Sequence, residues 1–565
     1  MPLPRLCRRA PWWGLFALFL LLGPVRAQQP PAAAVASAHP LATAAGIAIL
    51  QSGGNAFDAA VTVSAVLAVV EPYGSGIGGG GFWLLHRAED ARQVMIDGRE
   101  KAPLAASRDM YLDAGGEPVK GLSMDGPLAA GIPGEPAALV HIAENYGRLP
   151  LRVSLAPAIK LAREGFMVDE HYRRMAGFRL GVLREHPAAA RQFLVDNQIP
   201  AFGHLLRQPD LARTLESIAR HGFDGFYRGE VARQLVAGTR AAGGIWSEED
   251  LAAYRVIERT PVTGEFAGYR VVSAAPPSSG GVILIEMLNM LERLRLSDYD
   301  SANQVHLVTE VMRRAYQDRA LYLGDSDFVE VPVQRLIDPA YAEERIRDID
   351  VHKASVSEQM GRAEAKGEDT THFSILDGGG NRVAATLSVN YPFGACFVPP
   401  GTGVLLNNEM DDFSIKPGTP NAYGLVGNEA NAIAPGKRML SSMSPTFLER
   451  EDQVAILGTP GGSRIISMLV IGALQAAMGA PPEQWVGRAR FHHQYLPDLI
   501  QFEPEALSQK TQEILRRKGH RLKELDDGYG NMQAVVWDRG RGEVSAVSDP
   551  RGIGAAHVWQ AAANE

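Results

Sequence analysis

The clearest pattern along the chain is a pair of apolar stretches with helical spacing near its start. Residues 42–51 and 56–70 are dominated by Ala, Val, Ile and Leu, and Asn55 stands where a helix N-cap is favoured. Glu71 and Pro72 end the second stretch, because proline cannot continue a helix. The pattern predicts two helices with large apolar faces.

A glycine-rich segment follows at 74–81 and leads into the apolar run 82–85. Glycines of this kind can cradle a phosphate, but a phosphate loop follows a strand and opens a helix, and here the order is reversed. Close packing of the backbone is the favoured interpretation. The segment therefore predicts a tight turn between a buried helix and a buried strand.

The middle of the chain, 125–345, is predicted to be mostly helical. The strongest helical patterns are at 136–145, 151–164, 209–221 and 282–294. The glycine pair Gly280-Gly281 precedes the last of these helices at a loop-to-helix junction.

The pattern changes sharply at 352–369, which is polar and has few apolar anchors, and which predicts a mobile surface tail. Thr371, Phe373 and Ile375 then alternate with a second set of side chains, as in a strand. A turn at 377–381 and a second strand at 383–389 complete a hairpin. A tail that runs straight into a core strand is unusual inside a domain.

Composition excludes several classes of protein. The chain has 565 residues, of which 46% are hydrophobic and 21% are charged, and its net charge is −8. This is ordinary for a large globular protein, and it offers no basic face for a nucleic acid. The histidines show no metal-ligand spacing, so we expect no metal site.

The first 27 residues form a separate segment. Arg5, Arg8 and Arg9 precede an uncharged apolar stretch at 12–23, and 25–27 places small or apolar residues where a signal peptidase cuts. We therefore predict an exported protein, periplasmic or secreted, with no stable membrane span. The alternative is that this segment stays in place as an uncleaved membrane anchor.

The junction at Thr370 suggests a particular chemistry. A threonine hydroxyl becomes a useful nucleophile when its own free α-amino group serves as the base, which requires the chain to be cut before it. The reaction also needs backbone N–H groups that converge on an oxyanion, and Gly461 and Gly462 follow a strand-like run at 454–457. On pattern alone, a plain strand start and a plain turn remain the alternatives.

Several strings in the sequence carry a more specific signal. They are TTHFS at 370–374, LNNEMDDF at 406–413, LSSMSPT at 440–446, PGGSR at 460–464, DGRE at 97–100, RFHHQ at 490–494, SDPR at 548–551 and the glycine-rich 74–82. In this order and over nearly the whole chain, they resemble the γ-glutamyltransferase (γ-glutamyltranspeptidase, glutathione hydrolase) family of N-terminal-nucleophile hydrolases. The resemblance implies an α+β fold, a four-layer αββα sandwich built from both fragments of one precursor.

The resemblance also implies roles for individual residues. Thr370 would be both the nucleophile and the residue at which the precursor cleaves itself, after Asp369. The remaining implied roles are Gly461 and Gly462 in the oxyanion hole; Thr371 and Ser388 orienting the Thr370 amine and hydroxyl; Arg99, Ser441 and Ser442 on the substrate α-carboxylate; Asn390, Glu409 and Asp412 on its α-amino group; and Tyr423 in a lid loop at 417–437.

The implied product of maturation is a heterodimer of a large subunit, 28–369, and a small subunit, 370–565. It would transfer the γ-glutamyl group of glutathione or a related compound to water, an amino acid or a dipeptide, and this reaction implies no metal or organic cofactor. One alternative is an acylase of the same scaffold that acts on glutaryl-type β-lactam side chains. The other is an exported binding protein without catalysis, although such a protein has no reason to keep Thr370 and the glycine pair.

Overall fold

The computed structural model describes residues 29–357 and 370–560. The predicted signal segment, Asp369 and the predicted tail from 358 onward lie outside these ranges. Within them, none of the helices combines the length and apolarity needed to cross a membrane.

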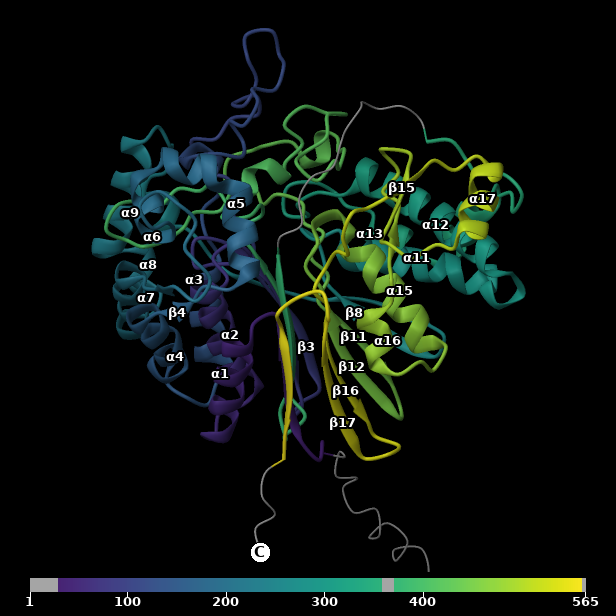
Figure 1. Ribbon diagram of the computed structural model, residues 1–565, viewed down its shortest axis with the longest axis horizontal. Helices are drawn as coiled ribbons and strands as arrows, with labels where there is room; N and C mark the ends of the chain where they lie inside the picture. Colours follow the sequence, from purple (N-terminus) through teal and green to yellow (C-terminus); the bar gives the residue numbers. More distant parts are fainter. Residues whose placement is uncertain (1–28, 358–369, 561–565) are drawn as a thin grey trace, which may run out of the picture.

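Two antiparallel β-sheets face one another at the centre, and helices cover the outer face of each, which gives four layers (Figure 1). The seven-stranded sheet has the order β18-β1-β9-β10-β2-β3-β6 and the six-stranded sheet the order β17-β16-β12-β11-β8-β7. The strands are β1 Ala33–Ser37, β2 Gly80–Arg87, β3 Arg92–Gly98, β6 Ile257–Arg259, β7 Val262–Phe266, β8 Tyr269–Ser273, β9 Thr371–Leu376, β10 Arg382–Ser388, β11 Thr446–Arg450, β12 Gln453–Gly458, β16 Gln533–Asp538, β17 Glu543–Ser548 and β18 Ala555–Trp559. This is the predicted αββα sandwich.

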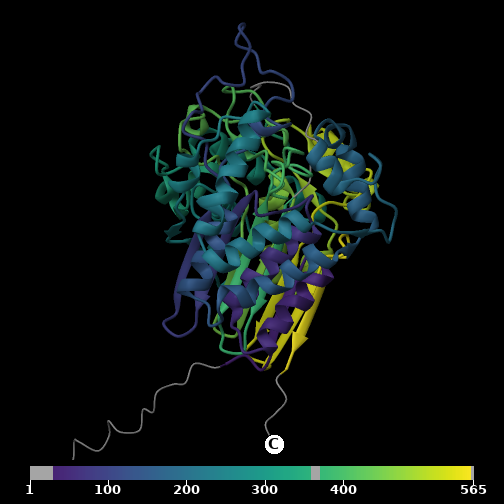
Figure 2. The same ribbon diagram turned by 90° about the vertical axis from the view of Figure 1, so that its left-hand side faces the viewer.

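The helices divide between the two outer layers. Figure 2 views the molecule from the side of the first layer, whose helices lie in front of the sheets. The first set is α1 Pro40–Gln51, α2 Ala56–Val70, α3 Glu135–Asn145, α4 Leu151–Glu164, α5 Glu170–Glu185, α6 Pro187–Phe193, α7 Pro209–His221, α8 Asp224–Tyr227, α9 Gly229–Ala241 and α10 Glu248–Ala252. The second set is α11 Gly280–Leu294, α12 Ser301–Tyr322, α13 Val333–Leu336, α14 Pro339–Ile346, α15 Ile465–Ala477, α16 Pro482–Gly487 and α17 Gln509–Lys518. Two small sheets outside the sandwich pair β4 Phe166–Met167 with β5 Leu205–Leu206, and join β13 Phe491–His492, β14 Ile500–Phe502 and β15 Leu522–Glu524.

Three apolar cores hold the layers together. One lies between the first helices and the seven-stranded sheet, one between the second helices and the six-stranded sheet, and a smaller one between the two sheets. The inter-sheet core includes Leu84, Phe447 and Trp537. Apolar side chains that alternate along β2, β12 and β16 supply both faces of their sheets, which is why those strands are nearly continuous apolar runs.

Sequence patterns located five helices of the first layer well, namely α1, α2, α3, α4 and α7. Asn55 caps α2 with its side chain and forms a reciprocal capping box with Asp58, as the N-cap prediction requires. The glycine-rich turn is packed as predicted, because a Cβ on Gly78 would lie 1.9 Å from the Leu405 carbonyl oxygen, and one on Gly79 would lie 2.1 Å from that of Ser388. No side chain fits there.

Two expectations need correction. The region 125–345 also contributes β7 and β8 to the six-stranded sheet, which its helical periodicity did not indicate. The prediction of a tail is wrong for 352–357, which is pinned to the body: Ala354 N–H donates to the Lys518 carbonyl at 2.8 Å and Ser357 N–H to Asp498 at 2.9 Å. Ala354 and Ser357 are buried by these contacts with a distant part of the chain, which composition alone does not reveal.

Candidate active site

Thr370 stands directly before β9, a strand in the interior of the seven-stranded sheet. Strand β9 pairs with β1 on one side and with β10 on the other, so the backbone that follows Thr370 is fixed in place. Within the described ranges, two cavities border this threonine, and they differ in size and character.

The smaller cavity has a volume of about 20 Å³ and is lined by residues that are distant in sequence. Of the predicted site residues, it brings together Thr370, Arg99, Ser388, Asn390, Glu409, Asp412, Tyr423, Ser441, Ser442 and Gly462. Arg99 comes from the end of β3, Ser388 from the end of β10, and the two acids from a short 3₁₀-helix at Glu409–Asp412. Residues from both sides of the 369–370 junction therefore share one cavity.

Arg99 is the electrostatic centre of this cavity. Its Nη1 lies 2.7 Å from Glu409 Oε1 and its Nη2 lies 2.6 Å from Asp412 Oδ2. Burial alone would lower the pKa of Arg99, but Glu409 and the other nearby carboxylates outweigh it and raise that pKa. Burial raises the pKa of Glu409 and of Asp412, with Arg99 opposing the shift.

A second arginine, Arg319 on α12, also lines the small cavity and was not predicted from the sequence. Its Nε donates to Ser279 Oγ at 3.0 Å and its Nη2 to Ser442 Oγ at 3.3 Å. Burial lowers its pKa to about 10, so it stays charged at neutral pH. Its sequence signal is weak: it is one of several charged residues on a helix that turns out to be buried on most sides.

The predicted oxyanion residues lie in the turn that follows β12. Gly461 and Gly462 have φ angles of +138° and +53°, which favour glycine. A Cβ on Gly462 would lie 2.4 Å from the Tyr423 ring, so the predicted lid residue packs directly on this turn. Tyr423 is buried, and its hydroxyl donates to the Asn390 carbonyl.

Thr371 lines neither cavity. Its hydroxyl donates to Glu71 Oε2 at 2.8 Å. Glu71, which sequence reasoning read only as the end of a helix, borders the larger cavity together with Thr370, and burial raises its pKa to about 7. The neighbouring His372 is not a base for the reaction, because burial lowers its pKa to about 3 and its nitrogens contact Thr386 and Ser374.

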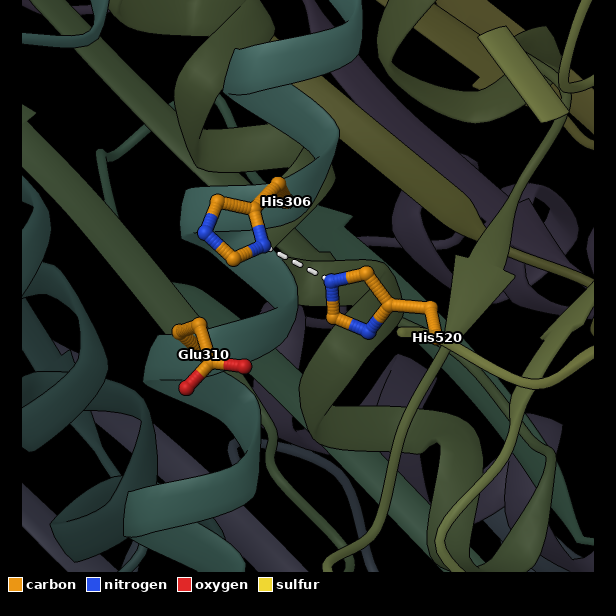
Figure 3. A group of neighbouring side chains, drawn as sticks. All are labelled: His306, Glu310 and His520. Atoms are coloured by element: carbon orange, nitrogen blue, oxygen red, sulfur yellow. Dashed lines mark hydrogen bonds between the residues drawn. The ribbon is translucent and has the colours of Figure 1, made fainter. Parts of the chain in front are cut away.

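Three side chains elsewhere are close enough to share a metal ion: His306 and Glu310 on α12, and His520 (Figure 3). Hydrogen bonds account for the close approach of the two histidines. His306 Nε2 donates to the Asp350 carbonyl at 2.9 Å, which leaves its Nδ1 to accept from His520 Nε2 at 2.7 Å. Glu310 already faces Arg313 and Arg314, whose charges oppose a cation.

The comparison with known proteins decides between the possible families. The family model for gamma-glutamyltranspeptidase matches residues 42–559. The glutathione hydrolase proenzyme of Escherichia coli (strain K12) is 41% identical over 540 residues, which are 94% of this chain and 92% of that protein. The chain belongs to the gamma-glutamyltranspeptidase family.

Solved structures in the same family class agree with the fold. Cephalosporin acylase from Bacillus halodurans superposes with a TM-score of 0.82 at 28% identity, covering 97% of this chain and all of that one. Gamma-glutamyltranspeptidase from Helicobacter pylori matches with a TM-score of 0.55 at 41% identity, covering 56% of this chain and 92% of that chain. The gamma-glutamyltranspeptidase fold seen here is therefore the αββα sandwich of N-terminal-nucleophile hydrolases, and transferases and acylases share it.

Proposed function

We propose that this gamma-glutamyltranspeptidase family member is the precursor of an enzyme that cleaves the γ-glutamyl amide of glutathione and related compounds. It passes the acyl group to water or to the amine of an amino acid or peptide. The observation that carries the proposal is the buried set of two arginines and two carboxylates in the small cavity beside Thr370.

This set of charges suits a zwitterion. The α-carboxylate of a γ-glutamyl group would pair with Arg99 and the serines, because the planar guanidinium matches a carboxylate. Its α-ammonium would pair with Glu409 and Asp412. Glu409 is buried, and the one cation within ion-pair distance of it in the described part of the chain, Arg99, is shared with Asp412. An incoming ammonium would supply a second positive charge for the two carboxylates.

The acylase alternative fits less well. A glutaryl side chain offers a carboxylate but no ammonium, so it would bring another negative charge close to Glu409 and Asp412 without a compensating positive one. The likeness to the Bacillus halodurans acylase shows a shared scaffold, and the charges of the small cavity favour γ-glutamyl substrates on that scaffold.

The reaction follows from the position of Thr370 between the two cavities. Its free α-amino group takes the hydroxyl proton as Oγ attacks the γ-carbonyl carbon, and the resulting oxyanion is held by the N–H groups of Gly461 and Gly462. The C–N bond then breaks, and the leaving nitrogen takes the proton. Water or an amine attacks the γ-glutamyl ester in the second half, and Thr370 recovers its proton.

The proposal includes maturation. The precursor would cut itself between Asp369 and Thr370, and 28–369 and 370–565 would remain together as a heterodimer after export and removal of the signal segment. Strand β9 supports this arrangement, because it begins the second fragment and pairs with β1 of the first, so the two fragments stay joined through one sheet.

The test uses purified protein and a chromogenic γ-glutamyl anilide, with and without a dipeptide acceptor. We expect release of the anilide, faster with the acceptor, and a small band on a denaturing gel that begins Thr-Thr-His-Phe. The Thr370→Ala variant is the control and should stay uncut and inactive. A single uncut chain that is active, or a small band with another N-terminus, contradicts the proposed mechanism. A cut protein without activity would favour the binding-protein alternative.

A further inference from the structure

The larger cavity that borders Thr370 has a volume of about 280 Å³ and is open toward solvent. One wall is formed by helix α5, which precedes the 369–370 junction, and the other by residues 527–531 together with Arg551 and Gly552, which follow it. In the proposed reaction the γ-glutamyl head fills the small cavity. The amine part of the substrate must then extend into this larger one.

Helix α5 presents a defined face to the larger cavity. His171, Arg174, Met175 and Phe178 all line it, and their spacing of i, i+3, i+4 and i+7 places them on one side of the helix. Asp169 caps the helix start by accepting from the Tyr172 N–H at 2.7 Å, which fixes the rotation of that face.

Most charged groups around this cavity are already paired. Arg551 is held by Glu503 and Asp549, with guanidinium-to-carboxylate distances of 2.6 and 3.0 Å. Glu71 is buried and accepts from Thr371. Asp527 stands on the opposite wall and is exposed.

Arg174 differs from these groups. Its one side-chain partner within the described ranges is His171 Nδ1, at 2.8 Å. Burial, with help from the charge of Arg174, lowers the pKa of His171 to about 4, so the imidazole is neutral at working pH and leaves the guanidinium charge uncompensated. Arg174 is exposed at the side of a cavity that the nucleophile borders, and it makes no ion pair with a carboxylate of the described chain.

We propose that Arg174 binds the free carboxylate of the amino acid or peptide that leaves from, or attacks, the γ-glutamyl ester. This inference rests on the proposed function and assigns a ligand class to the second cavity: α-amino acids and short peptides with a free C-terminal carboxylate. The cysteinylglycine part of glutathione and a dipeptide acceptor both carry that group. The aniline of a chromogenic substrate lacks it.

The experiment compares two donors that share the γ-glutamyl head and differ in the leaving group. In Arg174→Gln, kcat/KM for glutathione relative to kcat/KM for a γ-glutamyl anilide should fall about three- to tenfold, because one charge-assisted contact is lost for glutathione alone. Arg173→Gln is the matched control: this neighbour points to Glu170 and the Pro200 carbonyl and does not line the cavity, so the ratio should stay at the wild-type value.

A second arm uses acceptors. Wild-type protein should transfer to glycylglycine better than to glycylglycine amide, in which the carboxylate is masked, and Arg174→Gln should bring the two acceptors within about twofold of one another. An unchanged donor ratio together with unchanged acceptor preference overturns the role of Arg174. If the wild-type protein cleaves neither glutathione nor the anilide, the proposed function itself is overturned. The failure of the Arg174 proposal and the failure of the proposed function are therefore distinguishable.

Discussion

The two cavities that meet at Thr370 are built on opposite principles. The small one is lined mostly by buried side chains whose charges compensate one another, and its lining comes from eight separate segments of the chain. The lining of the larger one includes the exposed side chains Arg174, Phe178 and Asp527. Buried groups that are already paired suit one fixed chemical group, because a ligand that does not match leaves them unpaired in the interior. Exposed groups can still be solvated by water, so a change of ligand costs less binding free energy there. The contrast suits an enzyme with one acyl donor group and varied amine partners.

Disturbing the rigid side should have the largest effect. Gly462→Ala places a Cβ 2.4 Å from the Tyr423 ring at a φ of +53°. Either the lid residue or the turn with the oxyanion N–H groups must move, and a lost oxyanion donor costs about a hundredfold or more in kcat. Steady-state kinetics with the γ-glutamyl anilide would measure this decrease in kcat. A Gly181→Ala control has open space around its Cβ and should behave as wild type. Near-normal kcat for Gly462→Ala would remove this turn from the oxyanion hole.

Arg99→Lys comes next. Lysine keeps the charge but loses the fork that lies 2.7 Å from Glu409 and 2.6 Å from Asp412. We expect kcat/KM to fall about ten- to a hundredfold for glutathione and for the anilide alike, while self-cleavage proceeds. The loss of kcat/KM should be equal for the two donors, because both carry the γ-glutamyl group that Arg99 is proposed to bind. A loss confined to glutathione would place Arg99 on the amine side and break the contrast.

Sequence patterns predicted the site residues that lie in distinctive strings and missed those that do not. Thr370, Arg99, Glu409 and Asp412 belong to such strings, and the fold brings them to one cavity. Arg319 stood in an ordinary-looking helix, so it had no local signal. What makes it part of the cavity is packing between α12 and residues more than a hundred positions away, as in its bond to Ser442.

The same distinction applies to the fold. The helix bounds and the β9–β10 hairpin follow from local capping, periodicity and turn chemistry. The pairing of β9 with β1 and the face that α5 presents to Thr370 depend on contacts hundreds of residues apart. No local sequence pattern predicts these long-range contacts. For this reason the sequence indicated that Glu71 ends a helix, but not that it lines the larger cavity.

Glu71 tests the electrostatic half of the contrast. Unlike Glu409, it has no cationic side chain within ion-pair distance in the described ranges, and burial raises its pKa to about 7 from 4.5. The folded state therefore binds a proton that the unfolded state releases, and stability is lost as pH rises from about 4.5 through 7. Glu71→Gln removes this pH-dependent loss, which amounts to at most about 3 kcal/mol in the free energy of unfolding. In the uncut Thr370→Ala background, its melting temperature relative to the parent should rise between pH 5 and pH 8. Parallel pH profiles would show that Glu71 has a compensating charge.

The smallest effect is expected at Phe178, which is 58% exposed at the larger cavity, with its ring centroid 5.7 Å from that of Tyr391. Because the ring covers only part of any ligand there, Phe178→Ala should lower transfer to a phenylalanine-containing dipeptide about two- to threefold relative to glycylglycine. Phe202→Ala, at a side chain that is 67% exposed and does not line the cavity, is the matched control and should leave that ratio unchanged. Because Phe178 lines the cavity proposed for the amine, the substitution should have little effect on hydrolysis of the γ-glutamyl anilide, whose γ-glutamyl group binds in the small cavity. A tenfold loss of γ-glutamyl anilide hydrolysis in Phe178→Ala would mean that both cavities are rigid, and that the choice of amine partner is made elsewhere.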